Sequence, residues 1–197
     1  SDIHQAFRGY LKLAEGYSEP NHRHIFITHG LSGSGKTTLT GTLMQRLGAV
    51  RIRSDIERKR LFALNSNEQS DSTNIYTEDA SRRTYQCLTE LAIAITEGGY
   101  SVIIDATFLE QTERNRFQTL ATELDIPFTI LHFRTQPEVL SKRIQKRIES
   151  GNDASDADLK VLEWQLNTYM PLSKDELKVT IVIDTEAEQP LTPVLTN

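Results

Sequence analysis

Nine consecutive residues have the types and spacing to hold the phosphates of a nucleotide. The segment from Gly30 to Thr37 follows the pattern G-x-x-x-x-G-K-[ST] of a P-loop. Its glycines permit turns with positive φ, which point successive backbone N–H groups toward one anion. Lys36 is expected to reach the β- and γ-phosphates, and the Thr37 hydroxyl to coordinate Mg²⁺. We assign ATP binding to these residues: Gly30, Leu31, Ser32, Gly33, Ser34, Gly35, Lys36, Thr37 and Thr38.

The flanking sequence places this loop between a strand and a helix. His24–Thr28 is apolar and β-branched, as expected of a buried strand. After the loop, Leu39, Leu43 and Leu47 recur every four residues, which is typical of a helix. A helix N-terminus favours anions, so this context supports nucleotide binding over an accidental match of the motif.

Two aspartates each follow an expected strand. Asp55 comes directly after 49–53, where a carboxylate can accept a proton from an acceptor hydroxyl or orient it. The alternative is a helix N-cap, a role that Ser54 could also fill. Asp105 ends the apolar segment 100–105 and is a candidate Mg²⁺ ligand, the alternative being a solvated strand end or a cap. No Glu follows Asp105, which argues against a hydrolytic motor and for a transferase.

Arginines form the third set of candidates. Arg143 and Arg147 are four residues apart on one helix face and are candidates to clamp the transferring phosphoryl group. The alternative is a solvated basic face. Arg53, Arg58 and Arg114 are candidate substrate-binding residues, and for Arg114 a surface charge is equally favoured.

The order of the expected elements predicts an α/β fold. Five apolar strands, at 24–28, 49–53, 100–105, 127–133 and 179–184, alternate with helices. This pattern predicts a parallel sheet covered on both faces, with ligands at the carboxyl ends of its strands. We expect one domain over 24–197, preceded by an amphipathic helix and linker over 1–23. A mobile loop is expected at 65–74 and a frayed tail from Glu186.

Composition narrows the classes of function. The chain has 197 residues and a net charge of −5, which disfavours duplex nucleic acid as the main partner. Cys87 is the only cysteine, and no segment predicts a membrane span or a signal peptide. We therefore expect a cytoplasmic protein without an intramolecular disulfide. The chain begins with Ser1, as expected of a processed product or a fragment.

Together these segments resemble a group of small P-loop kinases that includes gluconate kinase, polynucleotide 5′-kinase, chloramphenicol phosphotransferase and zeta toxins. The resemblance is carried by 30–37, by Arg53-Ser54-Asp55-x-x-Arg58, by Asp105-Ala106-Thr107 followed by Arg114, and by Arg143-x-x-x-Arg147. The sequence is most similar to predicted kinases of the AAA_33 type, in which the P-loop domain often follows an aminoglycoside-phosphotransferase-like domain.

The resemblance implies a P-loop NTPase three-layer sandwich with strand order 2-3-1-4-5 and a helical lid around 138–156. It implies Asp55 as the base and Arg143 and Arg147 as lid arginines, and it makes 1–23 the joint to an upstream domain. The expected activity is Mg·ATP-dependent phosphorylation of a hydroxyl of a small molecule. A polynucleotide 5′-kinase, a zeta-toxin-like kinase of nucleotide sugars, and a nucleotide-gated module without its own acceptor are the alternatives.

Overall fold

The computed structural model describes residues 23–62, 77–150 and 159–195. Five strands lie in this part of the chain: β1 (Ile25–His29), β2 (Val50–Arg53), β3 (Val102–Asp105), β4 (Phe128–Arg134) and β5 (Thr180–Asp184). The longer helices are α2 (Lys36–Leu47), α3 (Ser54–Leu61), α4 (Glu78–Glu97), α5 (Gln111–Glu123), α6 (Pro137–Ser150) and α7 (Leu159–Thr168). The described helices include none that is long and apolar enough to cross a membrane. The expected helix at 1–23 and the loop at 65–74 lie outside the described residues.

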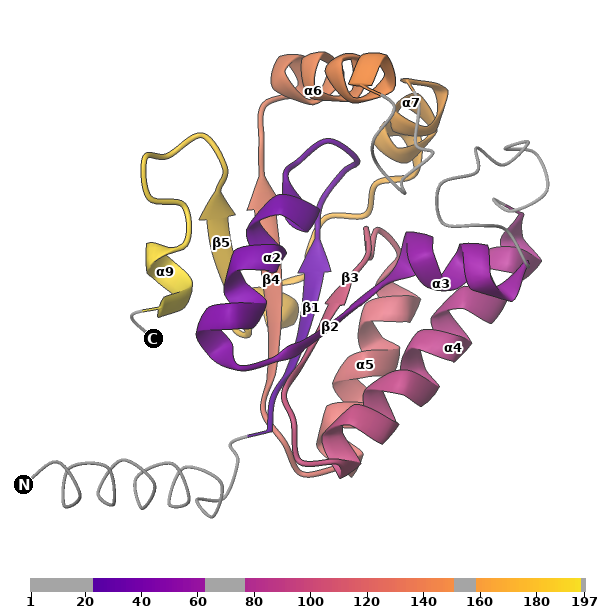
Figure 1. The fold of residues 1–197 in the computed structure, drawn as a ribbon, viewed down its shortest axis with the longest axis vertical. Helices are drawn as coiled ribbons and strands as arrows, with labels where there is room; N and C mark the ends of the chain where they lie inside the picture. The colour runs from indigo at the N-terminus through magenta and orange to yellow at the C-terminus, as the bar shows by residue number, and fades with distance from the viewer. Residues whose placement is uncertain (1–22, 63–76, 151–158, 196–197) are drawn as a thin grey trace, which may run out of the picture.

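The strands form one parallel sheet in the order β2-β3-β1-β4-β5, as expected (Figure 1). Each pair of neighbours is parallel, and the register places Ile27 beside Ile104 and Arg53 beside Asp105. Parallel sheets are buried on both faces, so their strands are apolar along their length. β1 and β3 follow this rule, since every one of their residues is buried.

Helices cover both faces of the sheet, which confirms the three-layer architecture (Figure 1). On one face, α2 and the short helix α9 (Thr192–Leu195) pack through residues such as Leu43 and Val194. On the other face, α4 and α5 pack through residues such as Leu88 and Phe117. α6 and α7 lie beyond the carboxyl ends of the strands (Figure 1). α6 includes the described part of the lid expected around 138–156, and the rest of that segment lies outside the described residues.

The C-terminal segment corrects one prediction. The tail from Glu186 was expected to fray, but Leu191 and Val194 are buried in the core against the sheet. Two apolar side chains spaced three apart are enough to pack a single helical turn, although the segment around them is polar. A second short helix, α8 (Lys174–Leu177), was also missed. It begins at a capping box in which Ser173 and Glu176 bond each other's backbone N–H groups.

A buried ion pair fastens α5 to α8. The Arg114 guanidinium donates to the Glu176 carboxylate at 2.5 Å, and the two side chains are 1% and 3% exposed. Arg114 also donates to the carbonyl oxygens of Phe108 and Leu109. Desolvation opposes ionisation of Glu176, but hydrogen bonds from Arg114 and Ser173 outweigh it and lower the pKa of this carboxyl.

Replacing Arg114 with Leu should leave the Glu176 charge buried without its partner. We expect the free energy of unfolding to fall by about 3–5 kcal/mol at pH 7. The folded pKa of Glu176 is lowered, so the stabilisation is present above its unfolded pKa and is lost as pH falls through the folded pKa. Urea denaturation at pH 7 and at acidic pH measures both effects.

The control is Lys178→Ala, which breaks the exposed Lys178–Asp175 pair at the C-terminal end of α8. We expect this change to cost about 0–1 kcal/mol. Equal losses in the two variants would contradict a special role for the buried pair.

Candidate active site

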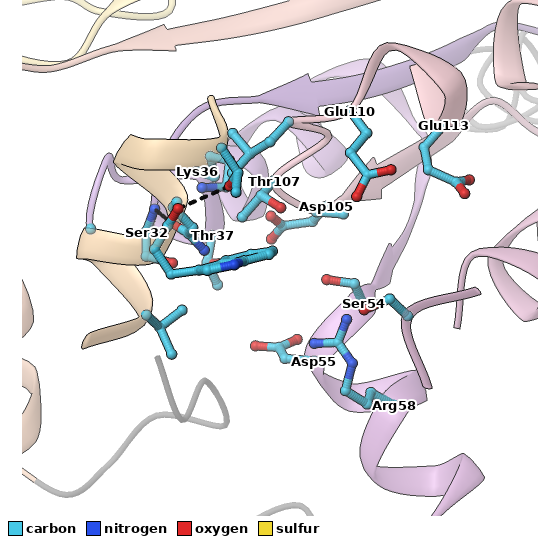
Figure 2. A pocket seen from close by; sticks show the side chains of 18 of the residues that line it. Ser32, Lys36, Thr37, Ser54, Asp55, Arg58, Asp105, Thr107, Glu110 and Glu113 are labelled. Carbon is cyan, nitrogen blue, oxygen red and sulfur yellow. Dashed lines mark hydrogen bonds between the residues drawn. The ribbon is translucent and has the colours of Figure 1, made fainter. Parts of the chain in front are cut away.

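A cavity of about 660 Å³ opens at the carboxyl ends of β1, β2 and β3 (Figure 2). Its volume is in the range of small-molecule sites. The residues that line it come from the P-loop, from the segments after β2 and β3, and from α4, α6 and α7. They are Ser32, Gly33, Gly35, Lys36, Thr37, Thr38, Ser54, Asp55, Arg58, Ser81, Tyr85, Asp105, Ala106, Thr107, Leu109, Glu110, Glu113, Arg143, Val161, Trp164, Gln165 and Thr168.

The P-loop wraps around the Lys36 side chain. Lys36 Nζ donates to the carbonyl oxygens of Gly30 and Leu31 at 2.8 and 2.7 Å. Gly33 and Gly35 have φ values of 82° and 88°, which a side chain adopts only with strain. A Cβ at Gly33 would also lie 2.9 Å from the Leu140 carbonyl oxygen of α6. The loop therefore requires glycine here for both its turn and its contact with α6.

Most of the predicted nucleotide-binding residues line the cavity, but three do not. Gly30, Leu31 and Ser34 lie on the far side of the loop, against Phe133 and Leu140. Leu31 packs beside Leu140, Ile144 and Leu162 in a small cluster that joins the loop to α6 and α7. These three residues therefore support the conformation of the loop on the side that faces away from the cavity.

Asp105 lies beside the P-loop at the end of β3. Its carboxylate is 5% exposed and accepts a hydrogen bond from Thr40 of α2 at 3.2 Å. Desolvation raises the pKa of this carboxyl, while the nearby Lys36 charge and a hydrogen bond with Thr37 oppose the rise. Carboxylate and hydroxyl oxygens are the donors that Mg²⁺ prefers. Thr37 and Asp105 thus fit a magnesium site.

Asp55 faces the P-loop across the cavity, from the first turn of α3 (Figure 2). Arg53 holds its carboxylate with two hydrogen bonds, at 3.2 Å from Nε and 2.6 Å from a terminal nitrogen. Arg53 itself does not line the cavity. Its two bonds to Asp55 place it behind that carboxylate, and its expected contact with the substrate stays a prediction.

The other predicted arginines divide between the cavity and the core. Arg58 lines the cavity. Arg143 reaches from α6 to the P-loop, where it donates to the Gly33 carbonyl oxygen at 3.5 Å, and it also donates to the Thr185 hydroxyl at 3.2 Å. Arg114 is buried against Glu176, with its guanidinium bonded on several sides, so it supports the loop after β3 from within the core. Arg147 belongs to α6, but its side chain lies outside the described residues.

Several lining residues were not predicted from sequence. α7 contributes Trp164 and Gln165, and the Gln165 Oε1 accepts the backbone N–H of Ser32 at 2.9 Å. Glu110 and Glu113 line the cavity from the start of α5. They lie five and eight residues after Asp105, at the carboxyl edge of the sheet, and this position is a signal that the sequence alone contains for these two acids.

A histidine pair lies behind the P-loop rather than in the cavity. The Nδ1 atoms of His29 and His132 are 2.8 Å apart and share a hydrogen bond. Burial lowers the pKa of His29 to about 3, and it also lowers the pKa of His132. Both side chains are therefore neutral at physiological pH. Neither side chain lines the cavity.

A family model described as an AAA domain, AAA_33, matches residues 25–172. This match covers the sheet from β1 to β4, the P-loop, the aspartates and the helices α6 and α7. The chain belongs to the AAA_33 family. A search of curated proteins found no match.

Solved structures of kinases resemble this AAA_33 domain. An unliganded sugar kinase from Janibacter sp. is 26% identical with a TM-score of 0.66, over 88% of this chain and 92% of that one. A gluconokinase from Sinorhizobium meliloti is 16% identical with a TM-score of 0.62, over 89% of this chain and 91% of that one. The second likeness supports the fold alone. With the family match, the first supports a small-molecule kinase of the P-loop type.

Replacing Gly33 with Ala should weaken nucleotide binding by at least about tenfold, because the new Cβ meets the Leu140 carbonyl at a backbone angle that alanine avoids. Titration with a fluorescent nucleotide measures the affinity. Gly48→Ala is the matched control, since Gly48 also has positive φ but no atom within 4 Å of the new Cβ. We expect that variant to lose some stability and to keep its affinity. A loss of affinity in both variants would refute the steric explanation.

Proposed function

We propose that the protein is a phosphotransferase that uses Mg·ATP to phosphorylate a hydroxyl of a small molecule. The observation that carries the proposal is that the P-loop and Asp55 line the same cavity, with Asp105 between them. A phosphate donor and a hydroxyl acceptor can thus be held within one enclosed volume. The likeness to a sugar kinase at 26% identity supports the same activity.

The nucleotide is held by the first half of the cavity. The N–H groups of the P-loop and the N-terminus of α2 attract the phosphates, and Lys36 exchanges its carbonyl partners for phosphate oxygens. Arg143 is close enough to the loop to bond the transferring group. Thr37 and Asp105 would hold the magnesium ion, which neutralises charge on the phosphate oxygens.

Asp55 acts on the acceptor. Because Arg53 fixes its carboxylate, Asp55 can orient the acceptor hydroxyl toward the γ-phosphorus and take its proton during transfer. The acceptor oxygen forms a bond to the γ-phosphorus, and the bond from that phosphorus to the bridging oxygen breaks. ADP leaves with the electron pair of the broken bond, and the proton moves to Asp55. Positioning and charge stabilisation supply most of the catalysis.

Changing Asp55 to Asn should lower kcat for acceptor-dependent ADP release by about 10²–10⁴-fold, because the side chain keeps its size but no longer accepts the proton. Assays with sugars, amino sugars, nucleosides and 5′-hydroxyl oligonucleotides measure the rate beside a no-acceptor blank. Asp79→Asn is the control, since Asp79 is exposed on α4 and pairs with Arg82. We expect it to leave the rate unchanged.

Two outcomes would count against the proposal. If no acceptor accelerates ADP release while ATP still binds, the nucleotide-gated module is the better description. If the Asp55→Asn variant keeps the full acceptor-dependent rate, Asp55 is not the group that activates the hydroxyl.

Changing Lys36 to Met should lower phosphoryl transfer by at least about 10²-fold, because one cation at the developing phosphate charge is lost. Thermal denaturation should show that the fold survives, since the methylene stem that packs in the loop is kept. Phosphoryl transfer at the wild-type rate in this variant would refute the proposed role of Lys36 and with it the proposed mechanism.

A further inference from the structure

We propose that the acceptor is a polyhydroxylated molecule with a protonated amine, such as an amino sugar or an aminocyclitol, bound by Glu110 and Glu113 and covered by Trp164. This inference rests on the proposed function and names the substrate class of the same cavity. It is carried by three features of the lining: its separation of charge, the two glutamates and the exposed indole.

Charge is separated along the cavity. Lys36 and Arg143 lie on the P-loop side, where phosphates would sit. Asp55, Glu110 and Glu113 line the opposite side, on the segments after β2 and β3 (Figure 2). Among the described residues that line this acceptor side, Arg58 is the single cation. Behind this wall, Arg53 pairs with Asp55 and Arg116 with Glu113, so Glu110 is the carboxylate here that has no salt bridge to a described residue. A carboxylate open to the cavity disfavours an anionic acceptor such as a sugar acid or a nucleotide sugar.

The Glu110 side chain makes no strong hydrogen bond within the described part of the chain. It occupies the N-cap position of α5, yet its side chain makes no capping hydrogen bond. Its carboxylate is exposed, and its hydrogen bond from Thr112 is long, at 3.5 Å. The carboxylate therefore remains open to a donor in the cavity.

Glu113 lies one turn later and is 14% exposed. Desolvation raises the pKa of its carboxyl, the Glu110 charge adds to the rise, and Arg116 opposes it. Arg116 Nε approaches the Glu113 Oε2 at 3.1 Å, but that oxygen has no well-aligned hydrogen bond. A cation bound between Glu110 and Glu113 would reduce the electrostatic repulsion between their carboxylates.

Trp164 provides the third feature. Its side chain lines the cavity but remains 60% exposed, which is unusual for an indole. The face of a tryptophan ring attracts ammonium groups and also packs against apolar faces of ring compounds. Carboxylates and an indole in one cavity suit an amine that also carries hydroxyls, because carboxylates accept hydrogen bonds from both groups.

The test uses the fluorescence of Trp164, which is the only tryptophan in the chain. Fluorescence titrations in saturating Mg·ADP would compare three six-carbon probes, D-glucosamine, D-glucose and D-gluconate, with 2-deoxystreptamine as an aminocyclitol. We expect the two amines to bind about tenfold more tightly than glucose, with gluconate the weakest. Acceptor-dependent ADP release with the same four compounds should follow the same order.

Variants separate the charge effect from a change in folding. The double change Glu110→Gln and Glu113→Gln should reduce the preference for amines to about threefold or less. Glu110→Lys, at an exposed position, should favour gluconate. The control is Glu123→Gln, on the exposed end of α5, which should keep the wild-type preference.

The inference and the proposed function fail in different ways. Amines that bind with the expected order but are not phosphorylated would support the amine-binding site at Glu110 and Glu113 and count against the proposed phosphoryl transfer. The inference is overturned if glucose or gluconate is bound and phosphorylated as well as the amines, if the preference survives the double change, or if no amine alters Trp164 fluorescence.

Discussion

The parallel register of three strands is the constraint on which the site depends. β1 pairs with β3, and β3 pairs with β2, so the chain leaves all three strands at the same edge of the sheet. Arg53 lies beside Asp105 in this register, which brings the segment after β2 close to the end of β3. The buried hydroxyl of Thr28 strengthens the arrangement, because it bonds both the carbonyl and the N–H of Ala106. The P-loop, Asp55 and Asp105 are thereby placed around one cavity.

Much of this was predictable from the sequence because local signals and the global fold agree. The apolar runs that became β1 and β3 are buried along their whole length, so their composition alone identified them. The P-loop has fixed spacing, and its strand and helix flank it directly. Asp55 and Asp105 were found because residues that follow parallel strands meet at one edge. The strand order itself came from the resemblance to known kinases and not from residue patterns.

The remaining features depend on contacts between distant segments. Gln165 accepts a hydrogen bond from Ser32, which is 133 positions away in the sequence. Nothing in the sequence of α7 distinguishes this glutamine from one on the surface. Arg114 was expected either to bind the substrate or to be a surface charge. It is buried instead, because Glu176, 62 positions away in the sequence, pairs with it. The tail after Glu186 packs through two side chains only, too few to produce a periodic pattern.

The hydrogen bond between Ser32 and Gln165 has a thermodynamic consequence. The backbone N–H of Ser32 has one hydrogen to donate, and it donates it to the Gln165 side chain. A phosphate oxygen that accepts this hydrogen bond must therefore displace Gln165, and Gln165 competes with the phosphate for it. Because α7 also contributes Trp164 to the cavity, a ligand that shifts α7 changes how readily the amide is released. Thermodynamic linkage makes this influence mutual. If a bound acceptor changes the nucleotide affinity by some factor, a bound nucleotide changes the acceptor affinity by the same factor. If both ligands bind as proposed, this one peptide group would couple the two halves of the cavity without any change in the sheet beneath them.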